Sequence, residues 1–108
     1  MQDKTLTKLE AQIRKVKAAL ATVGSMRPGT LSQQFRQPQT GEGAYYQLSY
    51  TYQGKSRTEH VRPAEVAAVR QEVAEYQRFK ALTTRWVDLA LERSWRQRDL
   101  ARARPAAP

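Results

Sequence analysis

The chain has 108 residues and a formal net charge of +9, with 19 Lys and Arg against 10 Asp and Glu. This length fits one domain, and the positive excess favours an anionic partner such as a nucleic acid. The absence of cysteine excludes disulfide bonds and thiolate metal sites. With no apolar run long enough to span a membrane and no signal peptide in its charged start, the chain is expected to be cytoplasmic and to have no membrane partner.

The first predicted element is a helix over residues 3–23. Its apolar residues recur at alternating intervals of three and four, which is the spacing of a heptad seam. They are Leu6, Leu9, Ile13, Val16 and Leu20. Asp3 or Thr5 would cap the start, and Gly24 would end the helix with a positive φ. Because three heptads are marginally stable alone, the seam predicts a partner, either within this chain or in a second copy.

Residues 24–44 are rich in Gly, Pro, Ser and Gln, a composition typical of a loop. Leu31 and Phe35 stand four residues apart in this segment. That spacing favours a single helical turn that anchors the loop to the core.

A β-hairpin is predicted over residues 45–61. Its first arm alternates apolar and polar residues, and a Gln-Gly pair at 53–54 supplies the turn. A two-residue turn would pair Tyr50 with Arg57, whereas a three-residue turn would place Tyr50 opposite Ser56. We favour the two-residue turn.

The tyrosines of this hairpin have two interpretations. Tyr46, Leu48 and Tyr50 alternate, so that they could simply pack one face of the strand on a helix. A binding role would require Tyr45 or Tyr52 to be exposed beside basic residues of the second arm.

The last element is predicted as a helix over residues 63–102, followed by a disordered tail over 103–108. Pro63 suits the first helical position, and no Gly or Pro interrupts the run. The fold class is therefore α+β and mainly α. The N-terminal and long C-terminal helices would form an antiparallel coiled-coil-like pair, with one β-hairpin between them, in a single domain over residues 1–102.

Aromatic and apolar residues near the end of the long helix predict an interface. Trp86 and Leu89, with Leu91 and Trp95, would lack a cover if the long helix extends past the first one, and a homodimer would cover them. The predicted interface combines two of these with the heptad seam: Leu6, Leu9, Ile13, Val16, Leu20, Trp86 and Leu89.

The positive excess is not spread evenly. Residues 63–91 carry four basic and four acidic residues, whereas the hairpin and both chain ends are basic. Arginine beside an aromatic residue can contact phosphates and stack on bases. The predicted nucleic-acid contacts are Lys55, Arg57, Arg62, Arg93, Arg96, Arg98 and Arg102, with Tyr45 and Trp95 as stacking residues. The competing interpretation is a solvated helix end whose basic residues favour the helix dipole.

The residues that catalysis or metal binding would require are missing. His60 is the sole histidine, and the Gly-rich stretch at 41–43 is too short to hold a phosphate. We therefore expect neither enzymatic activity nor a cofactor.

Several short motifs resemble those of a family of small uncharacterised prokaryotic proteins. They are Gly29-Thr30-Leu31, YYQLSY at 45–50, Gly54-Lys55 and YQRF at 76–79. The likeness covers roughly residues 26–92. Members of that family carry a cysteine-rich loop, which this chain lacks between Phe35 and Gly43. The resemblance implies a mobile-element or DNA-associated context without an established activity.

Together these patterns predict a non-enzymatic nucleic-acid-binding accessory protein of a mobile genetic element. They leave DNA and RNA undistinguished. The alternative is a coiled-coil adaptor or assembly subunit that binds an acidic protein or a larger ribonucleoprotein.

Overall fold

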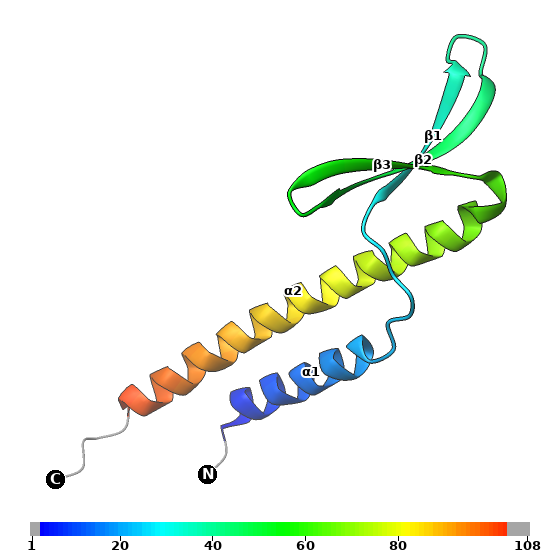
Figure 1. Ribbon diagram of the computed structural model, residues 1–108. Coiled ribbons are helices and arrows are strands. Elements are labelled where there is room, and N and C mark those ends of the chain that lie inside the picture. Colours follow the sequence, from blue (N-terminus) through cyan, green and yellow to red (C-terminus); the bar gives the residue numbers. More distant parts are fainter. Residues whose placement is uncertain (1–2, 104–108) are drawn as a thin grey trace. The chain divides into compact units, whose positions relative to one another are not determined.

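The computed structural model describes residues 3–103, which contain two long helices, a short 3-10 turn and three strands (Figure 1). These residues fall into two compact units. The helical unit comprises residues 3–22 and 79–103, and the sheet unit comprises residues 23–78. Each unit is described by itself.

Helix α1 spans Lys4–Leu20. Asp3, one of the two caps that the sequence left open, is the N-cap and accepts a hydrogen bond from the Leu6 backbone N–H at 3.0 Å. The predicted glycine stop was wrong, because Gly24 lies beyond the helix and is not among the residues with positive φ. The helix ends instead where the backbone N–H and side-chain hydroxyl of Thr22 both donate to the Ala19 carbonyl, so a threonine satisfies a terminal carbonyl.

Helix α2 spans Val66–Ala103 and is preceded by the 3-10 turn η1 at Pro63–Glu65. Proline at the start of this turn has no N–H to leave unpaired, which agrees with the predicted start. Ala103 is the last helical residue, and the rest of the predicted tail lies outside the described residues.

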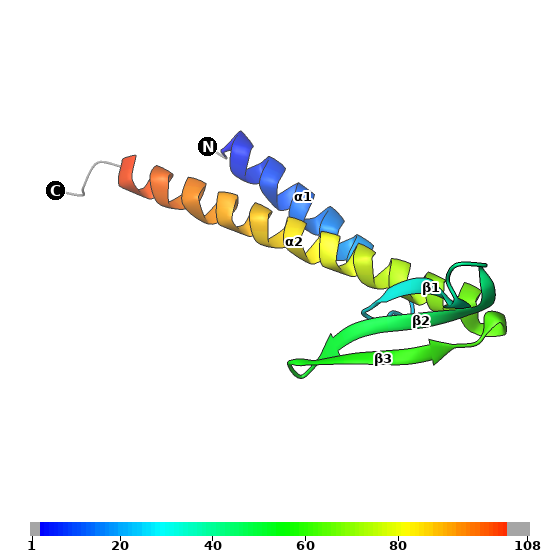
Figure 2. The ribbon, with the colours of Figure 1, turned by 90° about the horizontal axis from the view of Figure 1, so that it is seen from above.

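In the helical unit, α1 and the C-terminal part of α2 run side by side and antiparallel (Figures 1 and 2). Cross-helix contacts show the direction, since Asp3 pairs with Arg96 whereas Lys17 lies over Trp86. The apolar seam between the helices contains Leu9, Val16 and Leu89, which are buried, and Ile13, Leu20, Leu82 and Trp86, which are partly buried. The predicted antiparallel helix pair is confirmed.

The sheet unit contains three antiparallel strands in the order β1-β2-β3: Thr30–Gln37, Glu42–Tyr52 and Lys55–Val61 (Figure 2). Strands β2 and β3 form the predicted hairpin, and Tyr50 pairs with Arg57 as a two-residue turn requires. Gln53 and Gly54 have φ values of 52° and 76°, which identify the type I′ geometry that suits such turns.

The prediction of a loop over residues 24–44 was wrong from Thr30 onward, apart from the turn between β1 and β2. Strand β1 occupies part of that segment and β2 already begins at Glu42, so the expected single hairpin is extended to a three-stranded sheet. Leu31 and Phe35 caused the error, because residues four apart share a face on a strand as well as on a helix. Leu31 pairs with Leu48 of β2, and this cross-strand contact selects the strand.

One face of the sheet packs on the N-terminal turns of α2. Leu48 is fully buried there, with Val61 and Val66 beside it. Tyr46 and Tyr50 are partly buried against the same cluster. Packing therefore accounts for the alternating tyrosines on this face, as the simpler of the two interpretations predicted.

In the described part of the chain, neither long helix combines the length and apolar character that a membrane span would need.

Candidate nucleic-acid interface

Beside the turn of the β2–β3 hairpin, the strands carry an exposed tyrosine and two exposed basic residues that we call the hairpin tip: Tyr52, Lys55 and Arg57. Tyr52 and Lys55 are paired in register, and the Arg57 guanidinium lies 5.4 Å from the centre of the Tyr52 ring. This cation–π contact holds the guanidinium over the ring while both groups stay accessible. The structure therefore brings together two predicted phosphate contacts and an aromatic ring.

Tyr45 lies apart from this cluster. Successive residues of a strand point to opposite faces, so Tyr45 is on the face opposite to Tyr52. It is half-buried and stacks on His60, with ring centroids 6.2 Å apart and an interplanar angle of 27°. Arg62, the remaining basic residue predicted here, is exposed after the end of β3, and its Nε lies 3.9 Å from Glu65.

Arg93 and Arg96 form ion pairs across the helical unit. Arg96 donates two hydrogen bonds to the Asp3 carboxylate, at 2.8 and 3.3 Å, and Arg93 pairs with Glu10 at 3.2 Å. The Arg96 hydrogen bonds lower the pKa of the Asp3 carboxyl, with the Leu6 N–H as a second cause, and the same pair raises the pKa of Arg96. These two arginines join the helices of the unit.

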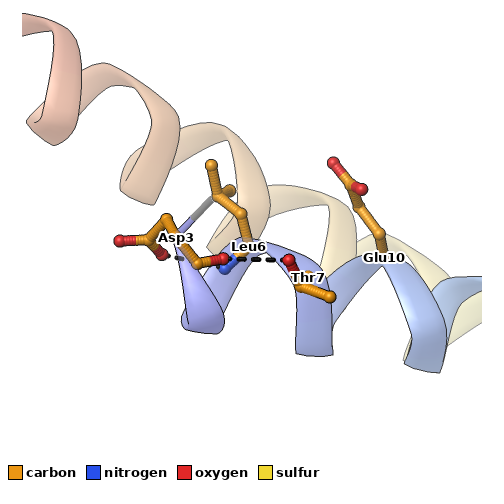
Figure 3. A pocket seen from close by; sticks show the side chains of 4 residues that line it. All are labelled: Asp3, Leu6, Thr7 and Glu10. Atoms are coloured by element: carbon orange, nitrogen blue, oxygen red, sulfur yellow. Dashed lines mark hydrogen bonds between the residues drawn. The ribbon is translucent and has the colours of Figure 1, made fainter. Parts of the chain in front are cut away.

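Asp3 and Glu10 line one side of a shallow hollow on α1, together with Leu6 and Thr7 (Figure 3). Thr7 donates its hydroxyl proton to the Asp3 backbone carbonyl at 3.1 Å. The carboxylates of Asp3 and Glu10 point to the side of α1 that faces α2, because Arg96 and Arg93 of α2 pair with them there. Leu6 is the partly buried first residue of the seam.

Trp95, Arg98 and Arg102 come together on the side of α2 that faces away from α1. They line a shallow hollow with Asp99, and the spacing of three and four residues places all four on one face of the helix. Trp95 is 57% exposed. This face is the third place where the structure gathers predicted contacts.

The residues predicted as an interface lie in the seam within the chain. Leu9, Val16 and Leu89 are buried between α1 and α2, and Trp86 is covered in part by Lys17, whose Nζ lies 5.5 Å from the ring centre. The large apolar residues of α2 that are exposed lie elsewhere on the helix. They are Val87, Leu91 and Trp95.

None of the five basic residues on α1 was predicted as a contact, although their exposure was expected, and four of them do not lie over Trp86 as Lys17 does. We call these four the α1 basic row: Lys4, Lys8, Arg14 and Lys15. All four are exposed on the side away from the seam. At 100° per residue, Lys4, Lys8 and Lys15 project within about 40° of one another, and Arg14 flanks them. The heptad spacing of the apolar residues contained this signal, because it fixes the opposite face.

No acidic side chain lies on the face that Lys4, Lys8 and Lys15 share, since Asp3 and Glu10, the acidic residues between positions 3 and 20, project to the flank of α1 on which Arg14 lies. The described part of the helical unit carries eleven basic and five acidic residues, whereas the sheet unit carries seven and five. The positive excess is therefore concentrated in the helical unit, and α1 presents an uncompensated part of it.

Comparison with known proteins gives one match. A family model described as a domain of unknown function, DUF6788, matches residues 6–71, which is more than half of the chain and includes most of α1, the sheet and the start of α2. No curated protein and no solved structure matches the chain significantly. The chain belongs to the DUF6788 family of domains of unknown function.

Proposed function

We propose that this protein is a non-enzymatic nucleic-acid-binding accessory protein, and that the α1 basic row is its main contact with the phosphate backbone. The observation that carries the proposal is the absence of acidic residues from the exposed face of α1 on which Lys4, Lys8 and Lys15 project together, with Arg14 at its edge. Such contacts supply affinity that is independent of sequence.

The spacing along α1 suits a polyanion. A rise of 1.5 Å per residue separates Lys8 from Lys15 by about 10 Å, and Lys4 extends the row by one further turn. Lysine side chains are long and flexible, so they can adjust to phosphates along either a duplex or a single strand. We include Lys55 and Arg57 of the hairpin tip as further contacts, with Tyr52 as a stacking residue.

The other predicted contacts fit this role less well. Arg93 and Arg96 are held by Glu10 and Asp3, and a phosphate would have to displace those carboxylates. Trp95, Arg98 and Arg102 face away from α1, so they do not extend the α1 basic row. The mobile-element context implied by the family resemblance supports DNA as the partner.

Fluorescence anisotropy with labelled single-stranded and double-stranded oligonucleotides tests the proposal. If about four phosphates are neutralised, a plot of log K against log salt should have a slope of about −3 to −4 for duplex DNA. The variant Lys8→Glu/Lys15→Glu should weaken binding by about tenfold or more at low salt. A binding constant that does not change with salt concentration would contradict the proposal.

The matched control removes the same amount of charge elsewhere. Arg36 and Arg70 are exposed residues of the sheet unit, and the variant Arg36→Glu/Arg70→Glu has the same net charge as the α1 double variant. If both variants lose affinity equally, binding depends on overall charge and not on the α1 basic row. Comparison with Lys55→Glu/Arg57→Glu then measures the contribution of the hairpin tip.

A further inference from the structure

The face of α2 that points away from α1 carries a row of exposed residues with heptad spacing. We call it the α2 outer stripe: Thr84, Asp88, Leu91, Trp95, Arg98 and Arg102. The intervals are four, three, four, three and four, so these residues form a continuous line about 27 Å long on the helix. Leu91 and Trp95 are 44% and 57% exposed at its centre, which leaves two large apolar side chains in water. Val87, 57% exposed, lies beside the stripe.

The α2 outer stripe is complementary to a second copy of itself that runs in the opposite direction. When a second copy of the helix runs antiparallel about a two-fold axis at position 93, Leu91 of each copy faces Trp95 of the other. In the same register Asp88 faces Arg98, and Thr84 faces Arg102. A two-fold axis repeats each of these contacts, as an isologous interface requires.

We propose that the α2 outer stripe is a homodimer interface, in which two copies of α2 pack antiparallel with Leu91 against Trp95 and Asp88 paired with Arg98. Among the described residues, neither Asp88 nor Arg98 forms an ion pair within the chain, so both charges are available for a partner. The two central contacts between Leu91 and Trp95 exclude water from the neighbouring Asp88–Arg98 ion pairs.

Charge selects this arrangement over the alternatives. A parallel pair in register would place Asp88 against Asp88 and Arg98 against Arg98, which is unfavourable at both positions. An acidic helix of another protein would match Arg98 and Arg102 but would place its own negative charge near Asp88. A second copy, reversed in direction, satisfies both ends of the stripe.

The dimer would also leave the α1 basic row free. That row lies on the side of the helical unit away from the α2 outer stripe, so each copy would keep its own row exposed. The dimer inference does not depend on nucleic-acid binding, and its test is performed without nucleic acid.

Sedimentation velocity over a concentration series, on the nuclease-treated 108-residue protein at moderate salt that does not screen the ion pairs, measures the association. The wild type should show a concentration-dependent dimer. Asp88→Arg and Arg98→Asp, each alone, should weaken dimerisation by about tenfold or more, because each places like charges opposite one another. The double variant Asp88→Arg/Arg98→Asp should restore it, because both pairs are then re-formed with exchanged signs.

Two further variants keep the test specific. Leu91→Glu should abolish the dimer while leaving the helical circular dichroism signal unchanged, because Leu91 is exposed in the monomer. Arg85→Asp changes the same charge as Arg98→Asp on an exposed residue outside the stripe and should leave dimerisation nearly unchanged. A wild-type protein that remains monomeric at all concentrations would overturn the proposal, and so would a dimer that survives Leu91→Glu or is not restored by the charge exchange.

Discussion

Asp3 and Arg96 lie 93 positions apart in sequence and form a two-point ion pair with N···O distances of 2.8 and 3.3 Å. The same carboxylate caps α1 by accepting the Leu6 N–H. One side chain thus performs two tasks, since it satisfies an unpaired donor at the start of α1 and fixes the position of α1 along α2. Two geometrically matched contacts at a helix terminus define the register of the helix pair more sharply than the apolar seam can.

Replacing Asp3 should separate these tasks. Asp3→Asn keeps a capping oxygen but removes the charge, whereas Asp3→Ala removes both. At neutral pH the melting temperature should therefore fall in the order wild type, Asp3→Asn, Asp3→Ala. Thermal unfolding followed by circular dichroism measures the three melting temperatures. Equal melting temperatures for the two variants would mean that capping contributes nothing here.

The Asp3 pair also predicts a dependence on pH. Hydrogen bonding to Arg96 lowers the pKa of the folded Asp3 carboxyl, so the stability from the pair is fully present above the pKa of an unfolded aspartate. It is lost as pH falls through the lowered folded value. The difference between wild type and Asp3→Asn should therefore close in acid, whereas Glu42→Gln, at an exposed carboxylate, should show little difference at any pH.

Truncating a core residue of the sheet unit should lower the stability by more than the loss of the Asp3 ion pair does. Leu48 is fully buried, between its paired neighbour Leu31 and the valines of α2. Leu48→Ala should lower the free energy of unfolding by about 2–5 kcal/mol, through lost burial and the cavity left behind. All five tyrosines lie in the sheet unit and both tryptophans in the helical unit. Near-ultraviolet circular dichroism in a denaturant titration can therefore follow the tyrosines of the affected unit.

The control for this core variant is the adjacent residue. Ser49 points to the opposite, exposed face of the same strand, so Ser49→Ala should change the stability by no more than about 0.5 kcal/mol. A comparable loss in both variants would indicate that the strand does not have the register described.

The long-range pattern of this fold was predictable where periodicity was unambiguous. Five apolar residues at heptad spacing predicted α1 and its seam, and the Gln-Gly pair at 53–54 predicted the hairpin with its register. Strand β1 was not predictable in the same way. Its apolar residues Leu31 and Phe35 fit a helix or a strand equally, and only pairing with β2, a contact between distant residues, decides between them.

For the candidate interface too, the sequence predicted one part and the tertiary structure decided the rest. The sequence predicted which residues are basic, but their partners depend on tertiary structure. Arg93 and Arg96 could not be separated from Arg98 by composition, although the fold pairs the first two with Glu10 and Asp3 and leaves the third exposed. The α1 basic row was visible in principle, because the seam fixes the opposite face of the helix.

Two glycines should respond in opposite ways to substitution by alanine. Gly29 has a φ of 143°, and an added Cβ would meet Leu48 Cδ1 at 2.6 Å, so Gly29→Ala combines backbone strain with a clash against the core. We expect a loss of about 1–3 kcal/mol in the free energy of unfolding. At Gly24 the φ is not positive and the nearest atom is Glu75 Oε1 at 3.7 Å. Gly24→Ala should be neutral or stabilise by up to about 1 kcal/mol. Denaturant titration measures both, and a Gly29→Ala variant as stable as the wild type would refute the close approach of residue 29 to Leu48.

Arg27 connects three parts of the sheet unit, and this arrangement predicts that arginine cannot be replaced there by lysine. Its guanidinium pairs with Glu59, lies 4.9 Å from the centre of the Tyr50 ring, and its backbone N–H donates to the Glu72 carbonyl at 3.1 Å. The hydrogen bond from Arg27 lowers the pKa of Glu59, so this pair too is lost as pH falls.

A lysine at position 27 keeps the charge but cannot present a planar group to the ring and the carboxylate together. Arg27→Lys should therefore destabilise the protein by nearly as much as Arg27→Met, with the loss limited to about 1 kcal/mol because Glu59 is partly exposed. Glu59→Gln should abolish the contribution of the pair to the acid dependence of unfolding while keeping the ring contact. Chemical denaturation of the three variants at neutral and acid pH separates the two contributions. Full stability in Arg27→Lys would show that charge alone is sufficient at this position.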